Sequence, residues 1–125
     1  MTMMIISDIE YHFVLPLSIE EFFTPKMKSD LALIVPDVLL QHRAGVKRLD
    51  VVKNRIYLHI SAPPDQPPKK IAEDMMWETS LRLIRVNSEL KGFVSVFDGR
   101  MFIKTGAKPA KKQIDDFVTI SNTGI

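Results

Sequence analysis

The alternation of apolar and polar side chains is strongest in the run Val51–Pro64. With a period of two, three aliphatic side chains fall on one face of an extended segment: Ile56, Leu58 and Ile60. The opposite face carries a cation, a phenol, an imidazole and a hydroxyl: Arg55, Tyr57, His59 and Ser61. Branched aliphatics suit a packed sheet, and the closing proline pair ends the ladder because proline has no N–H to donate. The run therefore predicts a strand with one face in the core, and we look for function on its other face.

Four further segments have a readable period. Residues 8–17 alternate and predict a first strand. Residues 26–43 carry apolar side chains at three-and-four spacing and predict a helix, which Pro36 should kink or split. Residues 46–53 predict a strand that forms a hairpin with the central strand. Pro68 to about Glu89 predicts a long helix with proline in its first turn.

The remaining part of the chain is divided by its turn residues. Asp98-Gly99 separates the apolar runs 92–96 and 101–105 and predicts a second hairpin. A last helix begins at Pro109. The order strand, helix, strand, strand, helix, strand, strand, helix predicts an α+β fold of the ferredoxin-like sandwich type, with a mostly antiparallel sheet and the helices packed on one face.

Composition narrows the class of protein. The chain has 125 residues, 46% hydrophobic and 26% charged, which is ordinary for a globular protein, and we expect residues 1–125 to form a single domain. It has no cysteine, which excludes disulfides, thiolate nucleophiles and thiolate metal ligands. The N-terminus lacks the basic region of a signal peptide, and no apolar run approaches the ~20 residues of a membrane span. We therefore expect a cytoplasmic protein without a membrane segment.

The net charge of +2 does not by itself indicate a nucleic-acid partner. Local clustering is more informative, because basic residues gather beside the strands and turns of the second half: Lys47, Arg48, Lys53, Arg55, Lys69, Lys70, Arg100, Lys104, Lys108, Lys111 and Lys112. The alternative interpretation is an ordinary solvated surface on which both signs are mixed.

Three local matches give a resemblance to a known family. They are YHFV at Tyr11–Val14, the central run Val51–Pro64, and FDGRMFIKTGA at Phe97–Ala107. In their order and spacing, these segments resemble the single-tyrosine HUH transposases of bacterial insertion sequences, which include the REP-associated tyrosine transposases. The order of elements matches from about residue 8 to about residue 120.

The resemblance implies a chemistry that this sequence lacks. In the family, two histidines of the central strand and a glutamine hold a divalent metal such as magnesium or manganese, which polarises the scissile phosphate of single-stranded DNA. A tyrosine of the last helix attacks and leaves a covalent 5′-phosphotyrosine. Here the histidine positions fall on Arg55 and Tyr57, the tyrosine on Phe117, and the glutamine near Ser121. Arginine does not give up its proton to ligate a metal, and phenylalanine has no hydroxyl. We predict neither metal binding of the family type nor strand cleavage.

A chain that has lost the catalytic residues can still bind nucleic acid, because a fixed guanidinium at Arg55 would replace the positive charge of the metal. Six side chains are then expected to line a cleft on the strand face: Arg55, Tyr57, His59, Lys69, Lys104 and Lys108. Tyr57 and Trp77 are candidate stacking platforms for unpaired bases. The expected partner is single-stranded or hairpin DNA, and the resemblance implies a homodimer. This hypothesis requires Arg55 and Tyr57 to lie outside the hydrophobic interior.

Two other hypotheses remain. The chain is a dimeric protein-interaction or structural remnant that binds no nucleic acid, in which case apolar side chains near Trp77 and Phe117 are exposed. Otherwise it is a residual enzyme in which His12 and His59 hold a substitute metal, although hydrogen-bonded histidines at a sheet edge are the commoner state of such residues.

Overall fold

The computed structural model describes residues 8–122, and side chains as far as residue 119. In this part of the chain the strands are β1 (Ile9–Pro16), β2 (Gly45–Val52), β3 (Arg55–Ala62) and β4 (Phe102–Thr105). The helices are α1 (Pro25–Leu40), α2 (Pro68–Val86) and α3 (Lys111–Asn122), with 3-10 turns at Glu20–Phe22 and Ser88–Leu90. None of the helices described combines the length and apolarity needed to cross a bilayer.

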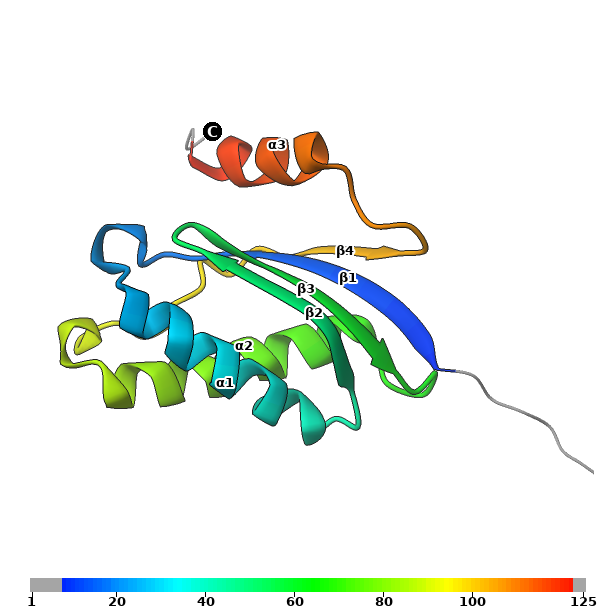
Figure 1. The fold of residues 1–125 in the computed structure, drawn as a ribbon, viewed down its shortest axis with the longest axis horizontal. Helices are drawn as coiled ribbons and strands as arrows, with labels where there is room; N and C mark the ends of the chain where they lie inside the picture. The colour runs from blue at the N-terminus through cyan, green and yellow to red at the C-terminus, as the bar shows by residue number, and fades with distance from the viewer. Residues whose placement is uncertain (1–7, 123–125) are drawn as a thin grey trace, which may run out of the picture.

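The strands form an antiparallel sheet in the order β2-β3-β1-β4. With α1 between β1 and β2 and α2 between β3 and β4, this is the ferredoxin-like arrangement, so the predicted α+β fold is confirmed. Figure 1 shows α1 and α2 side by side on one face of the sheet, as expected, and α3 on the opposite face. This position of α3 differs from the expectation that all helices pack on one face. It matters for function, because α3 covers the face on which the polar side chains of β3 lie.

The sheet has an apolar cluster on each side. The main core lies between the sheet and the α1/α2 layer and includes Ile56, Leu58 and Ile60 of β3, which confirms the face predicted for them. A smaller cluster joins Val14 and Tyr57 of the sheet to α3. The α3 residues in it are Ile114 and Val118, which lie four apart and therefore share one side of the helix.

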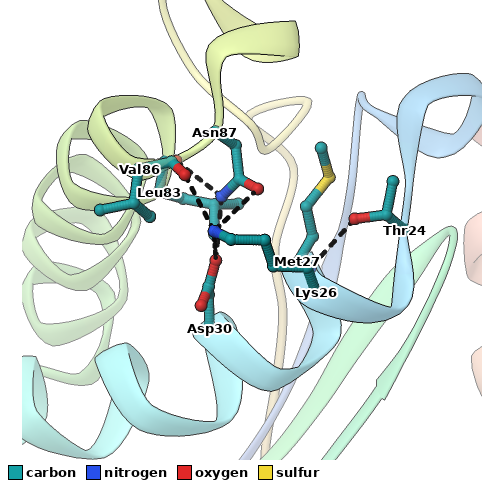
Figure 2. A network of polar contacts seen from close by, with 7 residues as sticks. All are labelled: Thr24, Lys26, Met27, Asp30, Leu83, Val86 and Asn87. Atoms are coloured by element: carbon teal, nitrogen blue, oxygen red, sulfur yellow. Dashed lines mark hydrogen bonds and ion pairs between the residues drawn. The ribbon is translucent and has the colours of Figure 1, made fainter.

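A polar network joins the start of α1 to the end of α2 (Figure 2). The ammonium of Lys26 donates to Oδ2 of Asp30 at 2.8 Å and to the carbonyl of Val86 at 2.9 Å. The buried amide of Asn87 donates to Oδ2 of Asp30 and to the carbonyl of Leu83, both at 3.0 Å. The network satisfies polar groups that the end of α2 would otherwise leave buried and unpaired.

The structure contradicts one expectation for local structure and one of the two alternatives of another. Residues 92–96 form no strand, because their backbone finds other partners: the amide of Val96 donates to the hydroxyl of Ser80 at 3.0 Å, and its carbonyl accepts from the amide of Ser18 at 2.8 Å. β4 consequently pairs with β1 and not with this segment. Pro36 does not split the first helix, since α1 continues through it to Leu40.

Candidate nucleic-acid interface

A row of basic and imidazole side chains crosses the whole sheet on the α3 side. Arg48 of β2 pairs in register with His59 of β3, His59 with His12 of β1, and His12 with Lys104 of β4. Residues paired across antiparallel strands point to the same face, so the four side chains form one row. We call Arg48, His59, His12 and Lys104 the basic row.

His12 is the buried member of the basic row, and both of its ring nitrogens are engaged. Nε2 lies 2.8 Å from the carbonyl oxygen of Gly106, and Nδ1 lies 2.6 Å from the hydroxyl of Tyr57. The carbonyl only accepts, so Nε2 carries a proton, and Nδ1 of the neutral ring accepts from the tyrosine. His12 is thus held by two strands and by the connection that leads to α3.

His59 stacks on His12 with the ring centroids 4.2 Å apart. Its Nε2 lies 2.7 Å from Oε1 of Glu10, and the ammonium of Lys47 is 3.4 Å from the other carboxylate oxygen. The bond from His59, followed by the charge of Lys47, lowers the pKa of Glu10 below its usual range. An exposed carboxylate therefore lies beside the basic row and offsets part of its charge.

Arg55 reaches α3 from the first position of β3. Its Nη2 lies 3.0 Å from Oδ1 of Asp115, and the ammonium of Lys111 lies 2.6 Å from the other oxygen of the same carboxylate. The hydrogen bond from Lys111 and the charges of Lys111 and Arg55 lower the pKa of Asp115. Asp115 thus remains ionised and holds both cations on the α3 side of the sheet.

Tyr57 faces away from the main core but is covered by α3, and only 4% of its surface is exposed. The ammonium of Lys108 lies 5.1 Å from its ring centroid. Burial raises the pKa of the phenol, with a smaller opposing effect of Arg48. A covered ring cannot stack on a base, so the expectation that Tyr57 is an open stacking platform is wrong. Tyr57 also fails the condition that it lie outside the hydrophobic interior, whereas the partly exposed Arg55 meets it. A phenol held neutral in this way is also a poor nucleophile.

Phe117 lies in the same region. Its ring centroid is 5.6 Å from that of Phe102, and the guanidinium of Arg100 is 4.9 Å from the ring and donates to the Phe117 carbonyl at 3.0 Å. Phe117 packs against the cluster that contains Tyr57. The three positions at which other residues replace the family's histidines and tyrosine, Arg55, Tyr57 and Phe117, therefore lie together within one chain. The fourth, Ser121, belongs to α3, but its side chain is outside the described residues.

The six expected binding residues divide between the two faces of the molecule. Five belong to the α3 side: Arg55, Tyr57 and His59 on β3, Lys104 on β4, and Lys108 in the connection to α3. Lys69 lies on α2, which covers the opposite face of the sheet, so it does not line the same surface. Trp77 is also on α2 and is 60% exposed. The expectation that Lys69 lines the strand-face cleft was wrong, because α2 packs on the core face of the sheet; Trp77, the second candidate stacking platform, is on the same helix.

The residues on the α3 side do not fit a divalent metal. Among the described residues, no three histidine, aspartate or glutamate side chains converge on one point. Both nitrogens of His12 already have partners, and Nε2 of His59 is engaged by Glu10. Arg55, at one family histidine position, pairs as a cation with Asp115.

The sequence did not predict the positions of two of the residues that shape this surface. Arg48 joins the basic row only because the β2–β3 register shifts between Val46 and Arg48, leaving Lys47 as the extra residue of a bulge. Simple alternation from Val46 would have turned Arg48 toward the core. Asp115 pairs with Lys111 at the spacing expected in a helix, but nothing in the sequence connects it with Arg55 on a distant strand.

Comparison by sequence gives no relatives: no protein-family model and no curated protein matches the chain. Comparison by structure does. A candidate transposase from Deinococcus radiodurans R1 superposes with a TM-score of 0.85 over 96% of this chain and 95% of its own, at 14% identity. The REP-associated tyrosine transposase bound to a REP hairpin superposes with a TM-score of 0.58 over 94% of this chain and 67% of its own, at 11% identity. The chain therefore has the fold of these transposases, and the resemblance seen in its sequence is confirmed at the level of fold.

Proposed function

We propose that this chain is a transposase-like DNA-binding protein of the single-tyrosine HUH type. In this proposal it has lost strand cleavage and transfer, and it binds single-stranded or hairpin DNA with the α3 side of its sheet. The observation that carries the proposal is the basic row, which spans all four strands of a sheet whose fold is shared with a transposase bound to a REP hairpin.

The two ends of the basic row are suited to phosphate contacts. Arg48 is exposed, and Asp50, at 2.9 Å, is the one ion-pair partner of its guanidinium among the described residues. The ammonium of Lys104 donates only to the carbonyl of Thr105 at 3.4 Å, so no carboxylate of the described residues neutralises it. Arg48 and Lys104 lie on the two outer strands of the sheet, three strand spacings or roughly 14 Å apart. Cations that contact phosphates at two such points supply binding that depends on salt.

The loss of cleavage is argued from the positions that would perform it. Tyr57 is buried and bonded to His12, and Phe117 has no hydroxyl. A transesterification needs an accessible hydroxyl and a group that stabilises charge on the phosphate. The α3 side offers Arg55 for the second role, and neither Tyr57 nor Phe117 offers an accessible hydroxyl for the first.

Fluorescence anisotropy with a labelled hairpin that carries a single-stranded extension tests binding. We expect affinity to fall as salt rises. Arg48→Gln or Lys104→Gln should weaken binding and reduce the salt slope by about one for each phosphate that the variant no longer binds. Lys69→Gln, on the opposite face, is the control with the same loss of charge. Binding without salt dependence, or an equal effect of Lys69→Gln, would refute the proposal.

Assembly is part of the same proposal. The family resemblance suggests a homodimer formed by a single transposase-like domain of residues 1–125, and the cysteine-free sequence suits the cytoplasm. Light scattering coupled to size exclusion, with and without DNA, gives the mass of the species that binds.

A second candidate function is a protein-interaction module without affinity for DNA. It is favoured by exposed apolar side chains on the outer surface of the helix layer: Leu33, Leu40, Trp77 and Leu81. In this case Trp77→Lys would lower the mass measured by light scattering, and the hairpin would not bind at any salt concentration. Retention of hairpin binding in Trp77→Lys would favour the first function.

A further inference from the structure

A groove of about 480 Å³ runs along the edge strand β2, between α1 and α3, and its volume lies within the usual range for ligand sites. Apolar surface comes from Val51, Val52 and Ile114 and from the ring of Tyr57. The lining also includes four cations: Lys28, Arg55, Lys108 and Lys111. We call this site the edge groove.

The charge of the edge groove is not balanced by its own residues. Lys28 and Lys108 line it, and neither has a carboxylate partner among the described residues. Its one acidic lining residue, Asp50, is already paired with Arg48 at 2.9 Å. Two uncompensated ammonium groups beside an apolar wall favour a ligand that carries negative charge on an apolar body.

Asp115 shows where such a negative charge would bind. Its carboxylate contacts Arg55 at 3.0 Å and Lys111 at 2.6 Å, and both of these cations line the edge groove. An arginine fork binds carboxylate and phosphate oxygens with the same geometry. The carboxylate of α3 therefore holds the arginine in a position that a phosphate can also use.

We propose that the edge groove binds a phosphate monoester on a body of nucleoside size, and that Asp115 competes with this phosphate for Arg55 and Lys111. The sugar and base would cover Val51, Val52 and Ile114, while Lys28 and Lys108 supply the charge that Asp115 does not neutralise. The ester is either a free nucleoside monophosphate or the 5′-phosphate at the end of a DNA strand. In the second case the inference rests on the proposed function and specifies which part of the strand this site holds.

Calorimetric titration with adenosine 5′-monophosphate, adenosine and inorganic phosphate tests the ligand class. We expect the monophosphate to bind at least about tenfold more tightly than either fragment, because each fragment leaves one half of the site unused. Equal binding of inorganic phosphate and the monophosphate would overturn the inference, since the apolar wall would then contribute nothing.

A matched pair of variants tests the competition. Asp115→Asn removes the competing charge and should tighten monophosphate binding roughly two- to fivefold, the change expected for the loss of one partly exposed ion pair. Asp116→Asn removes the same charge from the next residue, whose ion-pair partner is Lys112, and should leave the affinity unchanged. Equal effects of the two variants would overturn the role of Asp115. Unchanged far-ultraviolet circular dichroism and melting temperature in both variants show that the comparison concerns folded protein.

A second pair of variants tests the lining. Lys28→Gln should weaken monophosphate binding, and Lys69→Gln, which removes an equal charge from α2, should not.

Hairpin DNA with and without a 5′-phosphate then distinguishes the two sources of the phosphate monoester, a DNA strand end and a free nucleotide. A preference for the phosphorylated end that Lys28→Gln abolishes assigns the groove to strand ends, whereas monophosphate binding without such a preference assigns it to free nucleotide. If the hairpin binds but neither monophosphate nor the 5′-phosphate has any effect, the inference is wrong and the proposed function stands. Self-association through β2 that the monophosphate does not reverse would also overturn the inference.

Discussion

The hydroxyl of Tyr57 lies 2.6 Å from Nδ1 of His12, on the neighbouring strand of the sheet. Since Nε2 of the same ring donates to the carbonyl of Gly106, the phenol donates to the imidazole, and the proton of Tyr57 is directed into the protein. These two hydrogen bonds run from β3 through β1 to the connection that precedes α3. The phenol, at a position that the resemblance gives to a histidine, therefore has a structural role: through His12 it joins β3 to the connection that precedes α3.

Tyr57→Phe is expected to lower the free energy of unfolding by roughly 1–2 kcal/mol, because the buried Nδ1 of His12 loses its partner. Tyr11→Phe is the matched control, since no hydrogen bond of the Tyr11 hydroxyl is found among the described residues. Urea denaturation of both variants measures the difference. Equal free energies of unfolding for the two variants would show that the hydrogen bond between Tyr57 and His12 does not contribute to stability.

The phenol of Tyr57 is expected to ionise only above its ordinary range, because burial raises its pKa. The folded protein holds this proton more tightly than the unfolded chain does. The stability that the phenol contributes is therefore present below about pH 10 and is lost as the pH rises through the raised pKa. The phenolate absorbance of the wild type minus that of Tyr57→Phe isolates this titration. A midpoint at or below about pH 10 would contradict the burial of the ring.

Ile114→Ala is expected to loosen α3 without unfolding the sheet. Among the described side chains of α3, Ile114 and Val118 are buried in the small cluster, and truncation of Ile114 removes about 2 kcal/mol of packing from that interface alone. Hydrogen exchange in α3 should accelerate while exchange in β1 and β3 remains slow. Thr119→Ala changes an exposed residue of the same helix and serves as the control. Uniform acceleration across the sheet would mean that α3 and the main core unfold together.

Asn87→Ala is expected to cost about 1–3 kcal/mol, because it leaves the buried carbonyl of Leu83 without this donor and removes one of the partners of Asp30 (Figure 2). The variant lies in the helix layer, far from the α3 side of the sheet, so its affinity for hairpin DNA should remain that of the wild type. Thermal unfolding and anisotropy on the same sample check the two expectations. A parallel loss of binding would indicate that the helix layer takes part in recognition.

The sequence predicted correctly those elements in which the spacing of apolar side chains determines which face is buried. The alternation around Tyr57 separated a core face from a polar face correctly, because neighbouring side chains of any strand point to opposite sides of its sheet. The order of elements then predicted the ferredoxin-like arrangement. The predicted strand at 92–96 failed because Ser80 and Ser18 bind the backbone of Val96, and local propensity contains no information about such distant partners.

The candidate site was less predictable than the fold. That Tyr57 is covered follows from the side of the sheet that α3 takes, and Ile114 and Val118 would suit either face. Lys69 is separated from the strand-face cations because α2, which carries it, packs on the core face of the sheet. Arg48 entered the site through a bulge, and Asp115 through a contact between residues 60 positions apart. These features depend on tertiary packing, which the amino-acid pattern alone does not specify.

The central claim is that this chain binds hairpin DNA and leaves it intact. The most direct measurement incubates one labelled hairpin with the protein in magnesium or manganese, and runs the same sample on a native and on a denaturing gel. We predict a complex on the native gel that weakens with salt, and full-length, unmodified DNA on the denaturing gel. A covalent adduct or a nicked strand on the denaturing gel, or the absence of any complex on the native gel, would contradict the claim.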